Sequence, residues 1–306
     1  MKINVMGAGG VGGYFGARLA AAGSDVTFVA RGAHLAAMRR SGLRLDSEIG
    51  PLHLEPVKVV ADPAEIPAAD MVVFAVKMRD TESAAQSLKP LVAKGAAVFT
   101  FQNGVESAER VGRILGADNV VPGVARIGSH ISAAGVIKQI GTFCRLEFGE
   151  RDGKPSARTT AFQAACKAAG FEAVIPKNIE REVWMKFAML APLSGMTALT
   201  RGPIGPVRAN PQSRALLEAA INETVAVGVA LKTGLTPADA GDLLKLVDGF
   251  PEGLMASMAH DLLAGKPIEI EGLSGAVARL GAQCGVPAPT HTFIAQALAP
   301  FTNGKP

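Results

Sequence analysis

Glycines near the amino terminus have the spacing that binds a phosphorylated dinucleotide. Gly7, Gly9 and Gly12 form a G-x-G-x-x-G pattern directly after a short apolar run. In such a loop the first glycine allows a tight turn, the second lets the backbone approach a pyrophosphate, and the third lets helix and strand pack closely. The alternative is a glycine-rich turn that binds nothing. We predict a nicotinamide dinucleotide on this loop, held by Gly7, Gly9, Gly10, Val11 and Gly12.

The residue type at the end of the second predicted strand, 26–29, selects between the two nicotinamide cofactors. An acidic residue there accepts hydrogen bonds from the ribose 2′-hydroxyl, whereas an arginine accommodates a 2′-phosphate. The chain reads Val29-Ala30-Arg31-Gly32. Arg31 therefore predicts NADPH in preference to NADH, and a solvated surface arginine is the alternative.

A lysine that could transfer a proton lies in an apolar helical segment. Lys186 follows the only tryptophan, Trp184, and precedes the apolar run 187–193. Burial disfavours a charged ammonium and can bring a lysine into a range useful for proton transfer. From these residues alone, a lysine whose ammonium reaches solvent from an apolar helix remains the favoured interpretation.

Two polar residues follow predicted strands, at the edge where an open sheet builds its ligand site. Lys77 follows the strand 71–76, and Asn103 follows the strand 97–101, although Asn103-Gly104 is also a typical turn. Glu269 stands at the start of a helix predicted over 268–284, where the helix dipole favours a carboxylate without any function. The five histidines show no metal-ligand spacing, so we predict no metal site.

These residues need an α/β element order to position them, and the amino-terminal half supplies it. Strand, glycine loop, helix and strand follow one another within the first 30 residues, which is one βαβ unit. Their alternation with further predicted elements indicates a parallel, doubly wound Rossmann-type sheet. The further elements are strands at 57–60, 71–76, 97–101 and 120–124, and helices at 81–93 and 106–115.

The carboxyl-terminal half shows long helical periodicity with few strand-like runs. Glycine and proline separate its segments, as in Gly202-Pro203. We predict an NADP-binding Rossmann-like domain over 1–176 and an all-α substrate and catalytic domain over 177–306. The predicted helices of the second domain are 179–200, 211–233, 237–247, 254–264 and 268–284.

Composition limits the function classes. The 306 residues include 31 Lys and Arg against 27 Asp and Glu, a formal net charge of +4 without any run of about five like charges, so nucleic acid is not an expected partner. The longest uncharged run, 280–304, contains polar residues and prolines, so we expect no membrane span. Three cysteines without a paired spacing and the lack of an export signal favour the cytoplasm.

Together these residues resemble the ketopantoate reductase (2-dehydropantoate 2-reductase) family over essentially the full chain. The resemblance implies a Rossmann domain, a helical second domain, and NADPH-dependent reduction of a 2-oxo acid. The first candidate substrate is 2-dehydropantoate, reduced to pantoate in pantothenate and coenzyme A biosynthesis. The landmarks are Gly7 to Gly12 with Arg31, Lys77, Gln102-Asn103-Gly104, Trp184-Met185-Lys186, Ser257-Met258 with Asp261, and 266–269.

The resemblance also assigns roles to individual residues. It makes Lys186 the general acid that protonates the carbonyl oxygen, and Glu269 a partner of the substrate or of this lysine. It places Asn103 near the nicotinamide and Lys186, and Lys77 on the cofactor side. Ser257 becomes a hydrogen-bonding partner of the substrate.

The substrate pocket departs from the family pattern. Leu190, Ser194 and Ile204 stand where family members typically carry asparagines. Leu190 and Ser194 follow Lys186 by four and eight residues, so they share its helix face. Arg201 could bind the carboxylate of the substrate in place of these amides. The candidate substrate contacts are therefore Ser194, Leu190 and Arg201.

Two alternatives to ketopantoate reduction therefore stay open. One is a paralogous reductase of a more apolar 2-oxo acid. The other, from a different class, is a nicotinamide-binding redox sensor without turnover, since a Rossmann fold does not imply catalysis. The sequence does not fix the oligomeric state, and a homodimer is one option.

Overall fold

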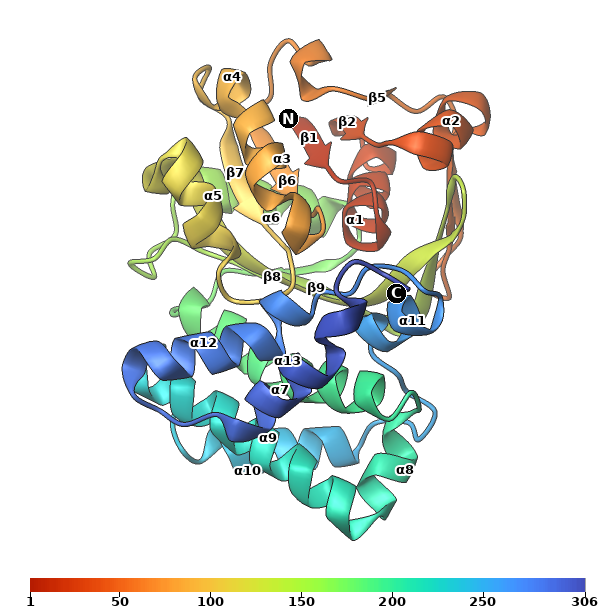
Figure 1. The fold of residues 1–306 in the computed structure, drawn as a ribbon. Helices are drawn as coiled ribbons and strands as arrows, with labels where there is room; N and C mark the ends of the chain where they lie inside the picture. Colours follow the sequence, from red (N-terminus) through yellow and green to blue (C-terminus); the bar gives the residue numbers. More distant parts are fainter. Residues whose placement is uncertain (306) are drawn as a thin grey trace. The chain divides into compact units, whose positions relative to one another are not determined.

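The computed structural model describes residues 1–305, which form two units by their contacts. The first unit comprises Met1–Gln102 and Glu106–Ile179, and the second comprises Asn103–Val105 and the chain from Glu180 onward. In Figure 1 the red, orange and yellow part of the chain belongs to the first unit and the blue part to the second. The short segment Asn103–Val105 therefore belongs to the second unit, although the residues on either side of it belong to the first.

The first unit is built on a ten-stranded sheet with the order β4-β3-β9-β8-β7-β6-β1-β2-β5, and β10 pairs with β9. Its central pairs, from β8 through β7, β6, β1 and β2 to β5, are all parallel. The strands are β1 (Lys2–Met6), β2 (Asp25–Val29), β3 (Leu43–Asp46), β4 (Leu52–Leu54), β5 (Val59–Val60), β6 (Met71–Phe74), β7 (Ala97–Thr100), β8 (Val120–Ala133), β9 (Val136–Phe148) and β10 (Glu172–Val174).

Helices cover both faces of this sheet, which is why its central strands are continuous apolar runs. Val98 and Phe99 are neighbours on β7, yet both are fully buried, each in a different core cluster. One cluster includes residues of α1 and α6, and the other includes residues of α3, α4 and α5. The helices are α1 (Gly10–Ala21), α2 (Gly32–Ser41), α3 (Thr81–Ser87), α4 (Lys89–Val92), α5 (Ser107–Leu115) and α6 (Ala157–Ala168), with 3-10 turns η1 (Pro63–Glu65), η2 (Met78–Asp80) and η3 (Ala117–Asn119).

The structure confirms a mostly parallel Rossmann-like sheet but extends it with an antiparallel hairpin. The strand predicted at 120–124 continues to Ala133, and it pairs antiparallel with β9. Much of the added length is partly exposed, so it lacks the continuous apolar run by which the buried strands are recognised. The helix predicted at 81–93 is divided into α3 and α4, because Pro90 lacks the N–H that would continue α3.

The second unit is helical, as predicted, and its core surrounds the long helix α7. Trp184 and Phe187 of α7 are 3% and 1% exposed and pack edge to face. The helices are α7 (Ile179–Leu199), α8 (Ile204–Ala209), α9 (Pro211–Ala230), α10 (Asp239–Asp248), α11 (Ser257–Leu263), α12 (Ser274–Cys284) and α13 (Pro289–Leu298), with 3-10 turns η4 (Ile270–Gly272) and η5 (Ala299–Phe301).

The predicted start of one helix of this unit was wrong. The segment 268–284 contains the short turn η4 and then α12, because Leu273 leaves the helical region with φ −114° and ψ −101°. Glu269 therefore precedes a 3-10 turn and does not lie in the first turn of a long helix.

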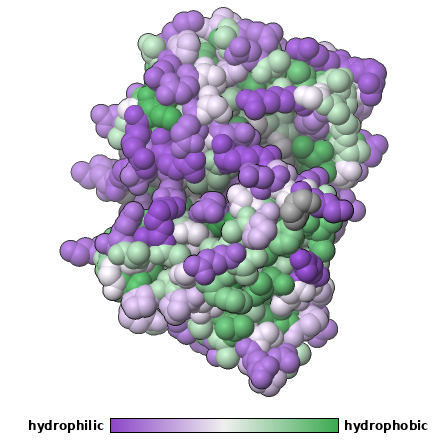
Figure 2. Space-filling model, in the orientation of Figure 1, coloured by the Kyte–Doolittle hydropathy of each residue, from purple (hydrophilic) through white to green (hydrophobic). Residues whose placement is uncertain are grey.

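The helices of residues 1–305 were compared with the length and apolar character of a membrane span. Within residues 1–305, no helix combines the length and the apolar character needed to span a bilayer. On the face drawn in Figure 2, hydrophilic residues predominate over the first unit, and apolar residues are more frequent over the second. Scattered exposed apolar side chains of this kind are usual for folded proteins.

Candidate active site

The glycine loop has the geometry expected of a phosphate-binding turn. Gly7 has φ +100°, a conformation that side chains other than glycine rarely adopt. A Cβ on Gly12 would overlap the Gly7 carbonyl oxygen and lie 2.9 Å from Cγ1 of Val5, so this glycine lets α1 pack on β1. A Cβ on Gly9, by contrast, would have no neighbour within 4 Å. The backbone at Gly9 therefore faces open space that a pyrophosphate could approach.

Gly10 has a further, steric reason to be glycine. A Cβ at this position would overlap the Ser129 carbonyl and come within 3.0 Å of the His130 nitrogen, both on β8. The β8–β9 hairpin thus packs against the first turn of α1. The sequence interpretation assigned Gly10 to the cofactor alone and missed this contact, because the two segments lie more than a hundred residues apart.

Arg31 lies beside the glycine loop, at the same edge of the sheet. The Ala8 N–H donates to the carbonyl of Val29, the last residue of β2, at 3.1 Å. Arg31 is the exposed N-cap residue of α2, whose start has neither a side-chain cap nor an acidic residue in its first turn. A free helix start next to an arginine suits an anion such as a 2′-phosphate.

The end of β6 also reaches this edge. The Ala75 N–H donates to the Met6 carbonyl at 2.9 Å, and a Cβ on Gly7 would lie 3.0 Å from the Ala75 carbonyl. Lys77, two residues further, is exposed and is the N-cap residue of η2. The predicted cofactor residues of the first unit therefore gather at the carboxyl ends of β1, β2 and β6, where open α/β sheets bind ligands, whereas Asn103 belongs to the second unit.

In the second unit, the structure brings Lys186 and Asn103 together. The Lys186 Nζ donates a hydrogen bond to Asn103 Oδ1 at 2.8 Å, across 83 positions of sequence. Lys186 is half-buried, between the buried residues Trp184 and Phe187. An amide oxygen accepts this hydrogen bond without being able to take the proton, so it holds the ammonium as a donor.

The other residues assigned to the helical domain differ in exposure. Ser257 is exposed at the first position of α11, and Glu269 is partly buried before η4. Leu190 is partly buried and packs against the helical core, and Ser194 is only 1% exposed, with no hydrogen-bond partner for its hydroxyl among the described residues. Ile204 is fully buried.

Arg201 does not lie beside Lys186. It follows the end of α7 with φ +50°, and its guanidinium stands 5.7 Å from the ring centroid of Phe301. Fifteen residues of mostly helical chain separate it from Lys186, a distance of about 20 Å at the helical rise. The structure therefore gives no support to a shared grip on one small substrate.

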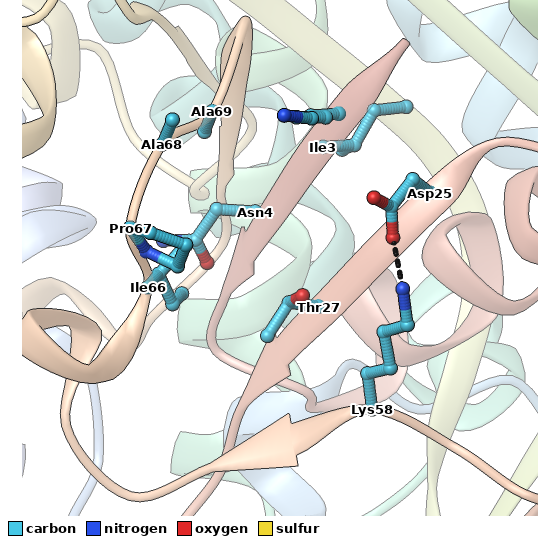
Figure 3. A pocket seen from close by; sticks show the side chains of 10 residues that line it. Ile3, Asn4, Asp25, Thr27, Lys58, Ile66, Pro67, Ala68 and Ala69 are labelled. Atoms are coloured by element: carbon cyan, nitrogen blue, oxygen red, sulfur yellow. Dashed lines mark hydrogen bonds and ion pairs between the residues drawn. The ribbon is translucent and has the colours of Figure 1, made fainter.

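A separate cavity of about 240 Å³ lies at the opposite edge of the Rossmann sheet (Figure 3). Lys2 and Asp25, the first residues of β1 and β2, line it, and Lys58 pairs with Asp25 at 2.6 Å. The side chain of Asn4 also lines this cavity. Because it stands at the amino ends of the strands, it is not the nucleotide site. Within residues 1–305, no three His, Cys, Asp or Glu side chains gather in a way that could hold a metal ion.

Comparisons with known proteins agree with this geometry. The model of the family "Ketopantoate reductase PanE/ApbA" matches residues 3–153, and that of its C-terminal domain matches residues 178–301. A 2-dehydropantoate 2-reductase from Mesorhizobium japonicum is 32% identical, covering 95% of this chain and 94% of that protein.

Solved structures give the same result. A PanE/ApbA family ketopantoate reductase from Ralstonia eutropha superposes with a TM-score of 0.90 at 30% identity, over 99% of this chain and 98% of that one. A 2-dehydropantoate 2-reductase from Geobacter metallireducens has a TM-score of 0.90 at 28% identity, over 98% and 99%. The chain belongs to the ketopantoate reductase family, oxidoreductases that act on CH–OH groups with a nicotinamide cofactor.

Proposed function

We propose that this protein reduces a 2-oxo acid to the 2-hydroxy acid with NADPH, and that 2-dehydropantoate, giving pantoate for pantothenate and coenzyme A biosynthesis, is its substrate. The observation that carries the proposal is the hydrogen bond from Lys186 to Asn103 Oδ1. It presents a proton donor, held by a group that cannot accept its proton. The open backbone at Gly9 supports the cofactor part of the proposal.

The residues of the chain supply the acid half of the reaction. NADPH, when bound, supplies the hydride. A carbonyl that accepts hydride develops negative charge on its oxygen, so an ammonium donor both stabilises that charge and neutralises it. Lys186 is this donor and Asn103 orients it. Glu269 contacts the substrate or the lysine, and Ser257 hydrogen-bonds the substrate.

The preference for NADPH rests on Arg31. Its guanidinium and the uncapped start of α2 offer charge and free N–H groups to a 2′-phosphate, and no carboxylate stands in that turn to bind a ribose hydroxyl. Titration of the protein with NADPH and with NADH, followed by cofactor fluorescence, tests this preference. Equal affinities would contradict it.

A panel of 2-oxo acids tests the activity itself. Oxidation of NADPH is followed with 2-dehydropantoate and with 2-oxo acids that carry plain branched alkyl tails. A protein that binds NADPH but oxidises it with none of these acids is the redox sensor, and the enzymatic proposal fails.

The same panel tests the paralogous reductase, which Leu190 and Ile204 favour. Neither side chain can hydrogen-bond the 4-hydroxyl of 2-dehydropantoate. An apolar pocket discriminates such a hydroxyl by about 10²-fold or less, whereas a pocket that binds it reaches about 10⁴-fold or more. We expect kcat/KM values within about 10²-fold across the panel. A 10⁴-fold preference for 2-dehydropantoate would show that other groups replace the missing amides.

Location and assembly complete the proposal. A cytoplasmic location fits the three free cysteines, Cys144, Cys166 and Cys284. A homodimer is one option for the assembly, and light scattering of the purified protein measures it directly.

A further inference from the structure

The side chain of Gln102 is fully engaged at the end of β7. Its Nε2 donates to the Val76 carbonyl and to Thr81 Oγ1, both at 2.9 Å, and its Oε1 accepts from the Ser107 hydroxyl. Gln102 is 8% exposed, Ser107 6% and Thr81 fully buried. Both amide hydrogens and the amide oxygen therefore have partners, so the side chain is fixed in one orientation.

The next three residues leave the first unit. Asn103–Val105 makes its contacts with the second unit, and Val105 packs against the helical core there. Gly104 has φ +93°, which allows the sharp reversal within this segment. The chain returns to the first unit at Glu106, and the hydrogen bond from Ser107 to Gln102 links the two ends of the segment Asn103–Val105.

Asn103 is the first residue of this segment, so the position of its backbone depends on Gln102, the residue before it. Its Oδ1 holds Lys186 Nζ at 2.8 Å. Asparagine has a short side chain with two rotatable bonds, so a shift of its backbone moves the amide oxygen by a similar amount. An error of about 1 Å in the position of a reacting group can cost about 10²-fold in rate.

We propose that Gln102 is a positioning residue for proton transfer, because its clamped amide fixes the backbone of Asn103 and thereby the Lys186 ammonium. This inference rests on the proposed function, in which Lys186 donates the proton. The three hydrogen bonds of the Gln102 side chain go to Val76, Thr81 and Ser107, all in the first unit. The same amide also holds the Val76 carbonyl, directly before the predicted cofactor residue Lys77.

Replacement of Gln102 by methionine tests the proposal, since methionine keeps the length of the side chain but removes all three hydrogen bonds. We expect kcat to fall by about 10²-fold while the affinity for NADPH stays within about twofold. The matched control is Gln163→Met on α6, which removes an amide hydrogen bond to the Ala173 carbonyl in the same unit, at 3.0 Å. This control should keep near-normal kcat. An equal loss of kcat in both variants would make Gln102 an ordinary structural residue.

A double substitution separates positioning from general support of the fold. If Gln102 acts through Asn103, then Gln102→Met should cause little further loss of kcat in an Asn103→Ala protein. A second loss of about 10²-fold in that background would overturn the proposal. Should Gln102→Met fail to fold, Ser107→Ala removes only one of the contacts and should lower kcat by a smaller factor, also without effect in the Asn103→Ala background.

A crystal structure of Gln102→Met gives a test that does not need activity. The distance between Asn103 Oδ1 and Lys186 Nζ should exceed hydrogen-bonding reach in the variant. An unchanged distance would overturn the positioning role even if kcat falls. If the native protein reduces no 2-oxo acid, the proposed function fails, while this distance still reports whether Gln102 positions Asn103.

Discussion

Two alanine substitutions in the glycine loop should separate its binding role from its packing role. Gly9 has φ −77° and ψ −162°, which alanine adopts without strain, and a Cβ there would have no neighbour within 4 Å. Gly12 stands in α1, and a Cβ there would overlap the Gly7 carbonyl oxygen. The two changes add the same methyl group to the same loop, in opposite surroundings.

The expected magnitudes follow from these surroundings. Gly9→Ala should change the free energy of unfolding by no more than about 0.5 kcal/mol, as for an unhindered surface position. Its methyl group would block the approach of a pyrophosphate to the backbone. Loss of one hydrogen bond to a charged group costs about 1.5–3 kcal/mol, or roughly 10- to 150-fold in NADPH affinity. Gly12→Ala should destabilise the protein by about 1–3 kcal/mol or more, because helix α1 must move away from β1.

Fluorescence titration with NADPH measures the affinity, and urea unfolding followed by circular dichroism measures the stability. We expect Gly9→Ala to lose affinity at native stability and Gly12→Ala to lose both. NADPH binding to Gly9→Ala with native affinity would refute the placement of the pyrophosphate on Gly9. A loss of stability in Gly9→Ala as large as in Gly12→Ala would refute the reasoning from open space.

Four further substitutions test the site and the fold. Lys186→Ala should lower kcat by about 10²–10⁴-fold with NADPH binding intact, and near-native kcat would exclude it as the acid. Arg31→Ala should weaken NADPH binding by about 1–3 kcal/mol and leave NADH nearly unchanged, whereas equal losses would refute its contact with the 2′-phosphate. Asn4 is fully buried, and neither polar atom of its amide has a hydrogen-bond partner among the described residues. Asn4→Leu should therefore raise the free energy of unfolding, measured with urea, by about 1–3 kcal/mol. A lower free energy of unfolding would show that the amide is hydrogen-bonded in the native protein. Burial lowers the pKa of His291 below its usual 6.5, so the unfolded chain binds the proton more readily than the folded protein does. The free energy of unfolding should therefore fall as the pH drops below about 6.5. If a His291→Gln protein loses the same stability between pH 7.5 and pH 5, other groups cause the effect.

Local signals account for what the sequence predicted well. The glycine loop and the first βαβ unit lie within 30 consecutive residues, and Gly12 is required by its close contact with Gly7 and with Val5 of β1. The long helix α7 was found within one residue of its bounds, because a buried helix of this length repeats its apolar pattern many times. Both features are encoded redundantly over short distances.

The elements that the sequence missed depend on distant partners. Several elements were not predicted: the helices α2, α6, α8 and α13 and the strands β3, β4 and β10. The strand β9 is recognisable only through its pairing with β8. A half-exposed strand carries a weak alternating pattern that a short apolar window does not detect. The contact of Ser129 with Gly10 has no local signal at all, since it requires the hairpin to fold over α1.

The candidate site also combines residues that can be predicted from local spacing with a contact between residues distant in sequence. Lys186, Leu190 and Ser194 share a helix face by spacing alone, so their proximity could be predicted from α7. The contact of Lys186 with Asn103 joins residues 83 positions apart in sequence and could be expected only from the family resemblance. Leu190 and Ile204 pack into the apolar core of the second unit, where neither side chain requires a polar partner. A backbone that superposes on ketopantoate reductases with a TM-score of 0.90 is therefore compatible with a different tail on the 2-oxo acid. We expect Leu190, Ser194 and Ile204 to decide the selectivity, because the overall fold does not constrain it.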